Sequence, residues 1–191
     1  MNVNFRNGIT MLVGLLFSIA TFAQNHPLKY KGHINAGVPL GDNKTNVLIQ
    51  TIHGVSSNTW FAGVGAGLDA YFQQSLPLFL DIRKNILHTG STPFIYADAG
   101  INFLAETNGQ TFSRGTSMKR RPGGYYELGA GYHIHLKTTA INLTAGYSFK
   151  AYKEDNYGIR YVPNMEPEED VLLESTRYRL QRIAFKIGFE F

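Results

Sequence analysis

The sequence is most informative at first for what it lacks. Its 191 residues contain no cysteine, so no disulfide bond holds the fold. After residue 23, no apolar run reaches the ~20 residues that a membrane-spanning helix needs, which excludes a helical membrane protein. The 18 Lys and Arg against 14 Asp and Glu are too balanced and too scattered to indicate nucleic-acid binding. Glycine (20), Phe (13) and Tyr (11) are abundant instead, which favours β-structure with a large core or a closed sheet.

The first 23 residues have the features of a secretory signal peptide. One cation, Arg6, precedes an apolar stretch of 12 residues (9–20), and small residues, Thr21 and Ala23, stand at positions −3 and −1 of the expected cleavage site. The alternative, a membrane anchor, would need a longer apolar run. We therefore expect export, a signal peptide over 1–23 and one folded domain over 24–191, with a formal charge of 17 − 14 = +3 once Arg6 is removed.

From residue 30 onward, apolar and polar residues alternate with period two, as in strands with two different faces. Between 140 and 152, Leu143, Tyr147 and Phe149 alternate with Ser148 and Lys150. Turn-forming residues divide the pattern into eight segments near the ~9–11 residues of a transmembrane β-strand. The predicted strands are 30–38, 47–55, 59–72, 78–87, 94–106, 124–136, 140–152 and 177–191.

The polar row of these strands is not typical of a face open to water. It mixes long charged side chains with many glycines, and a solvated face has no reason to prefer glycine, which weakens strands. A narrow barrel interior needs this mixture, because side chains must fill it and opposite charges must pair there. The predicted interior charge network contains Asp69, Asp81, Arg83, Asp98, Glu127, Lys150, Arg182 and Lys186.

The apolar row carries aromatic residues at both ends of the strands. Tyr30, Trp60, Phe189 and Phe191 would lie at one rim, and Phe72, Phe103, Tyr126 and Phe149 at the other. Two aromatic girdles around an aliphatic band are typical of barrels that cross a membrane. Connections also alternate between short and long, as such a topology requires. The sequence thus predicts an all-β protein, an eight-stranded, antiparallel, up-and-down transmembrane β-barrel.

Four stretches strengthen this reading: "TFAQ", "YYELGAGY", "INLTAGYSFKAY" and the terminal "IAFKIGFEF". On them the chain resembles the small OmpA/OmpX-type outer-membrane β-barrels, in the Bacteroidetes-like form described as an outer-membrane β-barrel domain of the porin family. The resemblance covers nearly all of 24–191. It implies residence in the bacterial outer membrane and a last strand that the barrel-assembly machinery reads, with Phe185, Phe189 and Phe191 as its signal.

Motifs for cofactor or metal chemistry are weak. "GVGAG" at 63–67 lacks the G-x-G-x-x-G spacing and lies within a strand, so it predicts no nucleotide site. His133 and His135 share one strand face, and with His33 they could hold Zn²⁺. A hydrogen-bonded interior wall is the reading that the pattern favours. We expect no cofactor and no metal.

Catalysis at a membrane barrel would need a serine, a histidine and an acid on the lipid-facing wall. His133, His135 and Ser148 fall on the inward row. His53 would face outward, but it lies toward the periplasmic end of its strand, away from the outer rim. We therefore expect no enzyme. A lipid-modifying enzyme or a narrow porin remains the alternative, although eight strands leave no wide pore.

Two long connections carry opposite charge. Residues 107–123 hold Arg114, Lys119, Arg120 and Arg121 and no acid, whereas 153–176 hold two cations and seven acids. The two segments could attract each other, or the basic one could bind lipopolysaccharide phosphate. The expected function is a structural or surface-interaction role through these extracellular loops, with outer-membrane lipid, lipopolysaccharide or a protein as partner.

Overall fold

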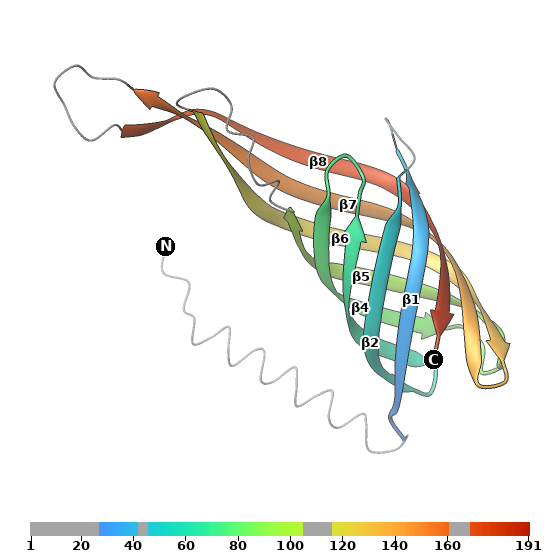
Figure 1. Ribbon diagram of the computed structural model, residues 1–191. Coiled ribbons are helices and arrows are strands. Elements are labelled where there is room, and N and C mark those ends of the chain that lie inside the picture. Colours follow the sequence, from blue (N-terminus) through green and yellow to red (C-terminus); the bar gives the residue numbers. More distant parts are fainter. Residues whose placement is uncertain (1–26, 42–45, 105–115, 161–168) are drawn as a thin grey trace.

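The chain folds into a closed barrel of eight antiparallel strands (Figure 1). The computed structural model describes residues 27–41, 46–104, 116–160 and 169–191. Each strand pairs with the next, and β1 pairs with β8, which confirms the predicted fold class. The described residues include no helix that is long and apolar enough to cross a membrane. The strands are β1 (Lys29–Leu40), β2 (Leu48–Ser57), β3 (Trp60–Asp69), β4 (Ser75–Asn85), β5 (Thr92–Leu104), β6 (Thr116–Leu136), β7 (Thr139–Arg160) and β8 (Glu169–Glu190).

The barrel has two unlike ends. Short connections at 58–59, 86–91 and 137–138 close one end, where Phe191 also lies; we call it the turn end. At the other end β6, β7 and β8 continue beyond the remaining strands, so we call it the arm end (Figure 1).

The outer wall of the barrel is apolar and the interior is polar. Along β4, Leu78, Leu80 and Ile82 are exposed, while Asp81 between them and Arg83 after them are buried. Leu68 and Leu128 keep 63% and 67% of their surface exposed, more than a protein core would allow. This distribution is the reverse of that in a water-soluble domain.

Aromatic side chains border the apolar wall at both ends. Tyr30, Trp60, Phe189 and Phe191 are exposed at the turn end, and Phe103 and Tyr126 at the arm end. Phe149 lies beside Tyr126, with ring centroids 6.3 Å apart. The aromatic borders predicted from the strand ends are therefore present.

Glycines leave room for rings inside the narrow barrel. A Cβ at Gly65 would lie 2.5 Å from the Phe79 ring, and one at Gly131 would lie 2.5 Å from the Phe94 ring. These distances are too short for any side chain, so each glycine is required by the large side chain that covers it. The "GVGAG" stretch is explained by interior packing.

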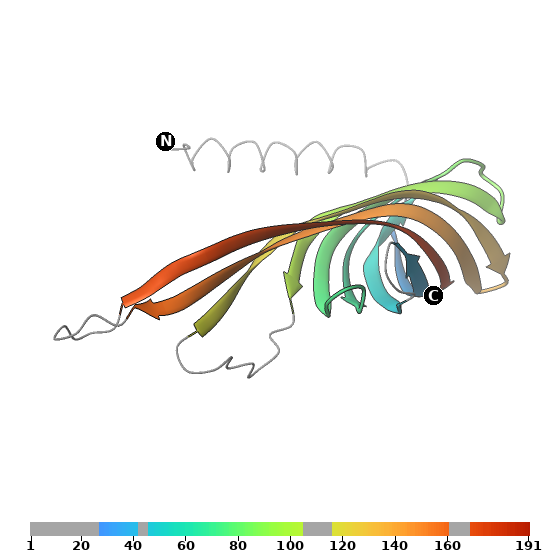
Figure 2. The same ribbon diagram turned by 90° about the horizontal axis from the view of Figure 1, so that it is seen from above.

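The predicted extracellular loops are wrong in extent. The predictions begin the sixth strand at 124, end the seventh at 152 and begin the eighth at 177, whereas the strands reach Thr116, Arg160 and Glu169. Residues 116–122, 152–160 and 169–178 form a three-stranded antiparallel sheet that projects past the barrel, which we call the arm (Figures 1 and 2).

The physical reason lies at Pro122. The pairing of β5 with β6 ends at Asn102 and Gly123, so Pro122 stands where no β5 partner requires its missing N–H, and a bulge follows it. Proline and clustered charge there are compatible with a sheet edge, although in a sequence they resemble a loop.

The third strand also ends earlier than predicted. It stops at Asp69, and residues 70–74 turn back toward the barrel mouth, with Phe72 at a φ of 64°. Such a φ is rare for a bulky residue and marks a constrained turn. Phe72 stays exposed and packs against Tyr178 of β8 at 5.8 Å, whereas its neighbour Tyr71 is buried.

Candidate functional site

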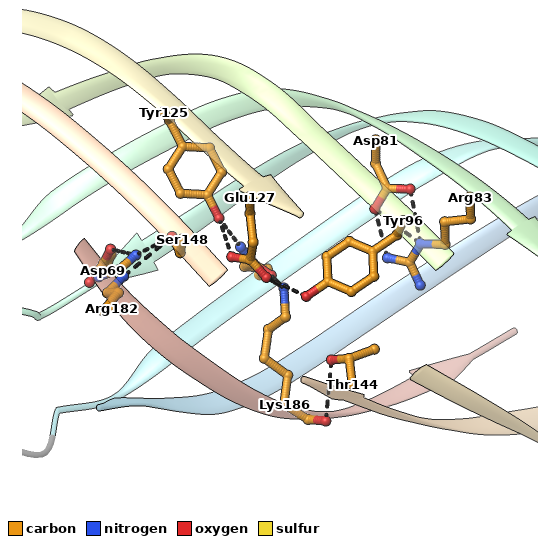
Figure 3. Close-up of polar contacts among 11 residues, drawn as sticks. Asp69, Asp81, Arg83, Tyr96, Tyr125, Glu127, Thr144, Ser148, Arg182 and Lys186 are labelled. Atoms are coloured by element: carbon orange, nitrogen blue, oxygen red, sulfur yellow. Dashed lines mark hydrogen bonds and ion pairs between the residues drawn. The ribbon is translucent and has the colours of Figure 1, made fainter. Parts of the chain in front are cut away.

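The barrel interior contains all eight charged residues that the sequence predicts to face inward. None exposes more than 7% of its surface. Seven of them take part in ion pairs, which fall into three groups along the barrel (Figure 3).

The first group surrounds Glu127 of β6. Lys186 of β8 donates to its Oε1, as does the Tyr96 hydroxyl at 2.6 Å, and the Tyr125 hydroxyl donates to Oε2 at 2.8 Å. Lys186 also donates to Gln50 of β2 at 3.1 Å. Side chains from β2, β5, β6 and β8 therefore meet in the middle of the interior (Figure 3).

The second group is a two-pronged ion pair on β4. Arg83 donates to Asp81 from Nε at 2.9 Å and from Nη2 at 2.8 Å. The guanidinium lies 5.7 Å from the ring centroids of both Phe61 and Phe94. These contacts help to hold the arginine in the interior, because a cation over a π-face is attracted to it.

The third group closes the arm end. Asp69 forms ion pairs with Arg182 and with Lys150, whose Nζ lies 3.3 Å from the carboxylate. Lys150 also donates to the Tyr71 carbonyl at 2.7 Å and to Ser75 at 3.1 Å. The β3–β4 turn is thus held across the barrel mouth, with the Tyr71 ring 5.3 Å from the Arg182 guanidinium.

Asp98 differs from its predicted role. Its carboxylate is buried, yet neither oxygen has a partner within the described part of the chain. The register places Asp98 between Asp81 and Glu127, which already form ion pairs with Arg83 and Lys186. The other two cations, Lys150 and Arg182, both form ion pairs with Asp69. Equal numbers of acids and cations therefore do not produce one-to-one pairing.

A smaller polar cluster lies at the turn end. His133 donates to Asn142 at 2.8 Å and lies 3.3 Å from Glu190, and Asn142 in turn donates to His33 at 3.2 Å. Lys31 forms an ion pair with Glu190. These residues border a cavity of about 30 Å³, room for about two water molecules.

The predicted zinc alternative is not assembled. His135 is exposed at the rim, with its ring 6.3 Å from that of His133, so the three histidines do not converge. Among the described residues, no group of three or more His, Asp or Glu has the arrangement for a metal ion. The sequence reading missed Glu190, although its place on the inward row of "RIAFKIGFEF" could have identified it.

On the outer wall, His53 is the exposed histidine that the sequence places near the turn end. Its ring contacts the Tyr30 hydroxyl at 2.6 Å and the Thr51 hydroxyl at 3.0 Å. Phe185, Phe189 and Phe191 also face outward. Phe191 exchanges both backbone hydrogen bonds with Gly32, so the last residue pairs with β1.

The predicted basic loop is largely a strand of the arm. Arg114 lies outside the described residues, while Lys119, Arg120 and Arg121 belong to β6. Arg120 pairs with Glu154 at 2.9 Å and Arg121 with Asp155 at 2.8 Å. The acidic and basic segments thus meet as neighbouring strands.

Asp155 organises the charges of the arm. The Ser175 hydroxyl donates to it at 2.8 Å, and Lys153 lies 3.2 Å away. The hydrogen bond from Ser175, followed by the Lys153 and Arg121 cations, lowers the pKa of Asp155. The carboxylate therefore stays ionised and links all three strands.

Comparisons with known proteins yield only distant similarity. No family model matches, and no curated protein matches. The N-terminal β-barrel domain of Pseudomonas aeruginosa OprF is 14% identical, with a TM-score of 0.47 over 86% of this chain and 100% of that one. The outer-membrane protein OprG of the same organism is 14% identical, with a TM-score of 0.43 over 84% and 93%. This similarity is too low to support an argument about function.

The fold and the site together define a class: a closed eight-stranded β-barrel with an apolar outer wall, aromatic borders and an ion-paired interior. The resemblance to one bacterial family of such barrels stays a prediction.

Proposed function

We propose that this protein is a non-enzymatic outer-membrane barrel that acts as a structural or surface-interaction protein. The observation that carries the proposal is the apolar wall between two aromatic borders. On β7, from Ile141 to Phe149, the wall covers eight residue steps, about 26 Å along the strand and about 20 Å along the membrane normal at a tilt of ~40°. A membrane barrel presents an apolar band of about 25 Å, whereas a soluble protein has no use for one.

The orientation follows from the two ends. Membrane barrels of this class have short turns on the periplasmic side and longer segments outside. The turn end would therefore face the periplasm, and the arm would stand outside the cell. Export through a signal peptide at 1–23, outside the described residues, is part of the same proposal.

A filled interior supports a structural role better than a porin role. Ion pairs join Lys186 to Glu127 and Arg182 to Asp69 across the interior, and the β3–β4 turn lies over its arm end. Eight strands enclose only enough space for such side chains. A narrow porin or a lipid-modifying enzyme is the alternative, and no contact of His53 specifically favours the enzyme.

The arm is the part of the molecule best suited to interaction. In the arm, the β6 edge over 116–122 and the β8 edge over 169–178 have no pairing with β5 or β1. Free strand edges can bind an added strand. The proposed partners are the barrel-assembly machinery during insertion, outer-membrane lipid around the wall, and lipopolysaccharide or a protein at the arm.

The absence of cysteine makes the orientation directly testable. Met118→Cys introduces one thiol on the arm, and Thr138→Cys introduces one at the turn end; both positions are exposed. In intact cells, a membrane-impermeant maleimide should label Met118→Cys only, and Thr138→Cys should react after the outer membrane is permeabilised. Labelling of Thr138→Cys in intact cells, or of neither variant under any condition, would overturn the proposal.

A further inference from the structure

The outer face of the arm and of its junction with the barrel is strongly basic. Residues directly opposite each other in neighbouring strands share a face, and the register aligns Arg121 with Lys153 and Lys153 with Arg177. Lys119 lies opposite Asp155, and Arg179 opposite Ala151 on the same face. In the cross-strand rows through Ala151, Lys153 and Asp155 of β7, the described outer face thus carries five cations and one carboxylate. We call Lys119, Arg121, Lys153, Arg177 and Arg179 the basic patch.

Two members of the patch have unused binding capacity. Asp155 is shared by Arg121 and Lys153, and Lys119 lies 4.9 Å from the Tyr157 ring centroid. Arg177 and Arg179 are exposed and form no hydrogen bond or ion pair with any described residue. One carboxylate cannot neutralise five cations, so the patch has an excess of four positive charges.

The patch begins where the apolar wall ends. Tyr126 and Phe149 mark the aromatic border, and on β7 Ala151 and Lys153 follow Phe149 by two and four residues. That spacing is about 7–13 Å along the strand, or about 5–10 Å along the normal at a tilt of ~40°. The headgroup layer occupies about 5–8 Å on each side of the hydrocarbon core. Arg179, opposite Ala151, therefore lies at the height of the lipid headgroups, and the row of Lys153 lies just outside them.

The same strands carry an apolar groove within the wall. A hollow of about 840 Å³ lies over β6, β7, β8 and β1. Ala130 and Ala145, which lie opposite each other in neighbouring strands, line it together with Leu143, Phe185 and Ile187. Ala145 precedes Lys153 by eight residues on β7, so an acyl chain descending from a headgroup at the patch would reach the groove.

We propose that the basic patch and this groove form a binding site for a phosphorylated glycolipid of the outer leaflet. This inference rests on the proposed outer-membrane orientation. Arg177, Arg179 and Lys119 would bind the phosphates, since guanidinium groups form paired, charge-assisted hydrogen bonds with them. The groove would take one acyl chain. A lipid is favoured over an acidic protein because the patch is continuous with the wall that faces lipid.

The test uses the full-length mature barrel, refolded in a neutral detergent, and measures binding of diphosphorylated lipid A by fluorescence titration. The variant Arg177→Gln/Arg179→Gln removes two cations that have no partner in the described chain. Its matched control, Lys29→Gln/Lys137→Gln, removes two exposed cations at the turn end. We expect the first variant to bind about 30-fold more weakly at physiological salt and the control to bind like the wild type. Dephosphorylated lipid A should bind the wild type as weakly as the diphosphorylated form binds the variant.

Several results would overturn the inference. Equal binding of phosphorylated and dephosphorylated lipid would exclude a phosphate site, and an equal loss in the control would mean that net charge alone acts. Binding of inorganic phosphate as tightly as lipid A would assign the patch to free phosphate. An acidic peptide that displaces the lipid from the wild type at lower concentration than lipid A itself would favour a protein partner. In all these cases correct cysteine labelling would leave the proposed orientation intact, so the two proposals fail separately.

Discussion

At the scale of single residues, the interior is organised around carboxylates that receive several donors at once. Glu127 accepts from Lys186, Tyr96 and Tyr125, and Asp69 forms ion pairs with Arg182 and Lys150. Removing such a carboxylate leaves a buried cation without a partner, which costs more than the loss of an ordinary contact. Asp98, with no partner in the described chain, is the residue whose loss should matter least.

The substitution Glu127→Ala should therefore destabilise the barrel strongly. We expect a loss of about 3–5 kcal/mol in the free energy of unfolding, because Lys186 remains buried and uncompensated. Urea unfolding in detergent micelles measures the effect. Leu128→Ala, one residue away on the outer wall, is the matched control and should have a smaller effect. Equal losses for the two variants would show that the inward placement of Glu127 is wrong.

At the scale of elements, the arm and the terminal strand depend on different forces. The barrel part of β8 is paired on both sides, with β1 and β7, whereas the arm pairs with neither β5 nor β1 and adds cross-strand charge pairs to its own strand pairing. Ion pairs whose cation is partly exposed are weak individually, so the order of the arm depends on the acids staying ionised. The arm should consequently respond to pH before the barrel does.

The pH prediction follows from Asp155. Its pKa in the folded protein is lowered from the ordinary value of 3.8, so its stabilising effect is complete above about pH 3.8 and is lost as pH falls through the lower folded-state value. Amide hydrogen exchange, corrected for intrinsic rates, should show the arm opening in that range while the barrel stays protected. Asp155→Asn should already increase exchange of the arm at pH 7. If the arm were equally protected at pH 7 and in this acidic range, and unaffected by Asp155→Asn, the proposed role of Asp155 would be contradicted.

The last strand should be required for assembly. Phe189 lies opposite Ile34 on β1, and Phe191 pairs with Gly32, so deletion of 189–191 removes the turn-end part of the β1–β8 pairing and two exposed rings of the aromatic border. We expect the truncated chain to be degraded in the periplasm, whereas Phe191→Tyr, which keeps the ring and the backbone pairing, should assemble. Membrane fractionation and immunoblotting compare them. Normal outer-membrane levels of the truncated chain would count against the barrel assignment.

At the scale of the whole molecule, period-two alternation predicts most of the architecture. The first five strands match their predicted bounds within three residues. Inward residues such as Glu127 and Lys186 follow directly from their parity, that is, from their odd or even position in the alternation of the strand. Parity fixes the face of a residue but not its partner. This is why Asp98 was expected to pair and why the meeting of Glu190 with His133 was not foreseen.

The arm could not be predicted for a different reason. Pro122 and the charges after it favour a loop in any local reading, and only the end of β5 pairing at Asn102 makes them compatible with a strand. The inward turn at Tyr71 likewise depends on Lys150, which lies 79 residues away in the sequence. Contacts of that range are set by closure of the barrel rather than by local propensity.

The central claim is that the apolar wall of this barrel lies in lipid, and the single tryptophan tests it most directly. Trp60 is 54% exposed at the turn-end aromatic border. In the wild-type protein refolded into vesicles, lipids brominated at defined acyl positions should quench its fluorescence. Quenching should be strongest for bromine near the headgroups and weak for bromine near the chain ends, because aromatic borders lie at the membrane interface. Emission typical of tryptophan in water, with no quenching by any of these lipids, would contradict the account.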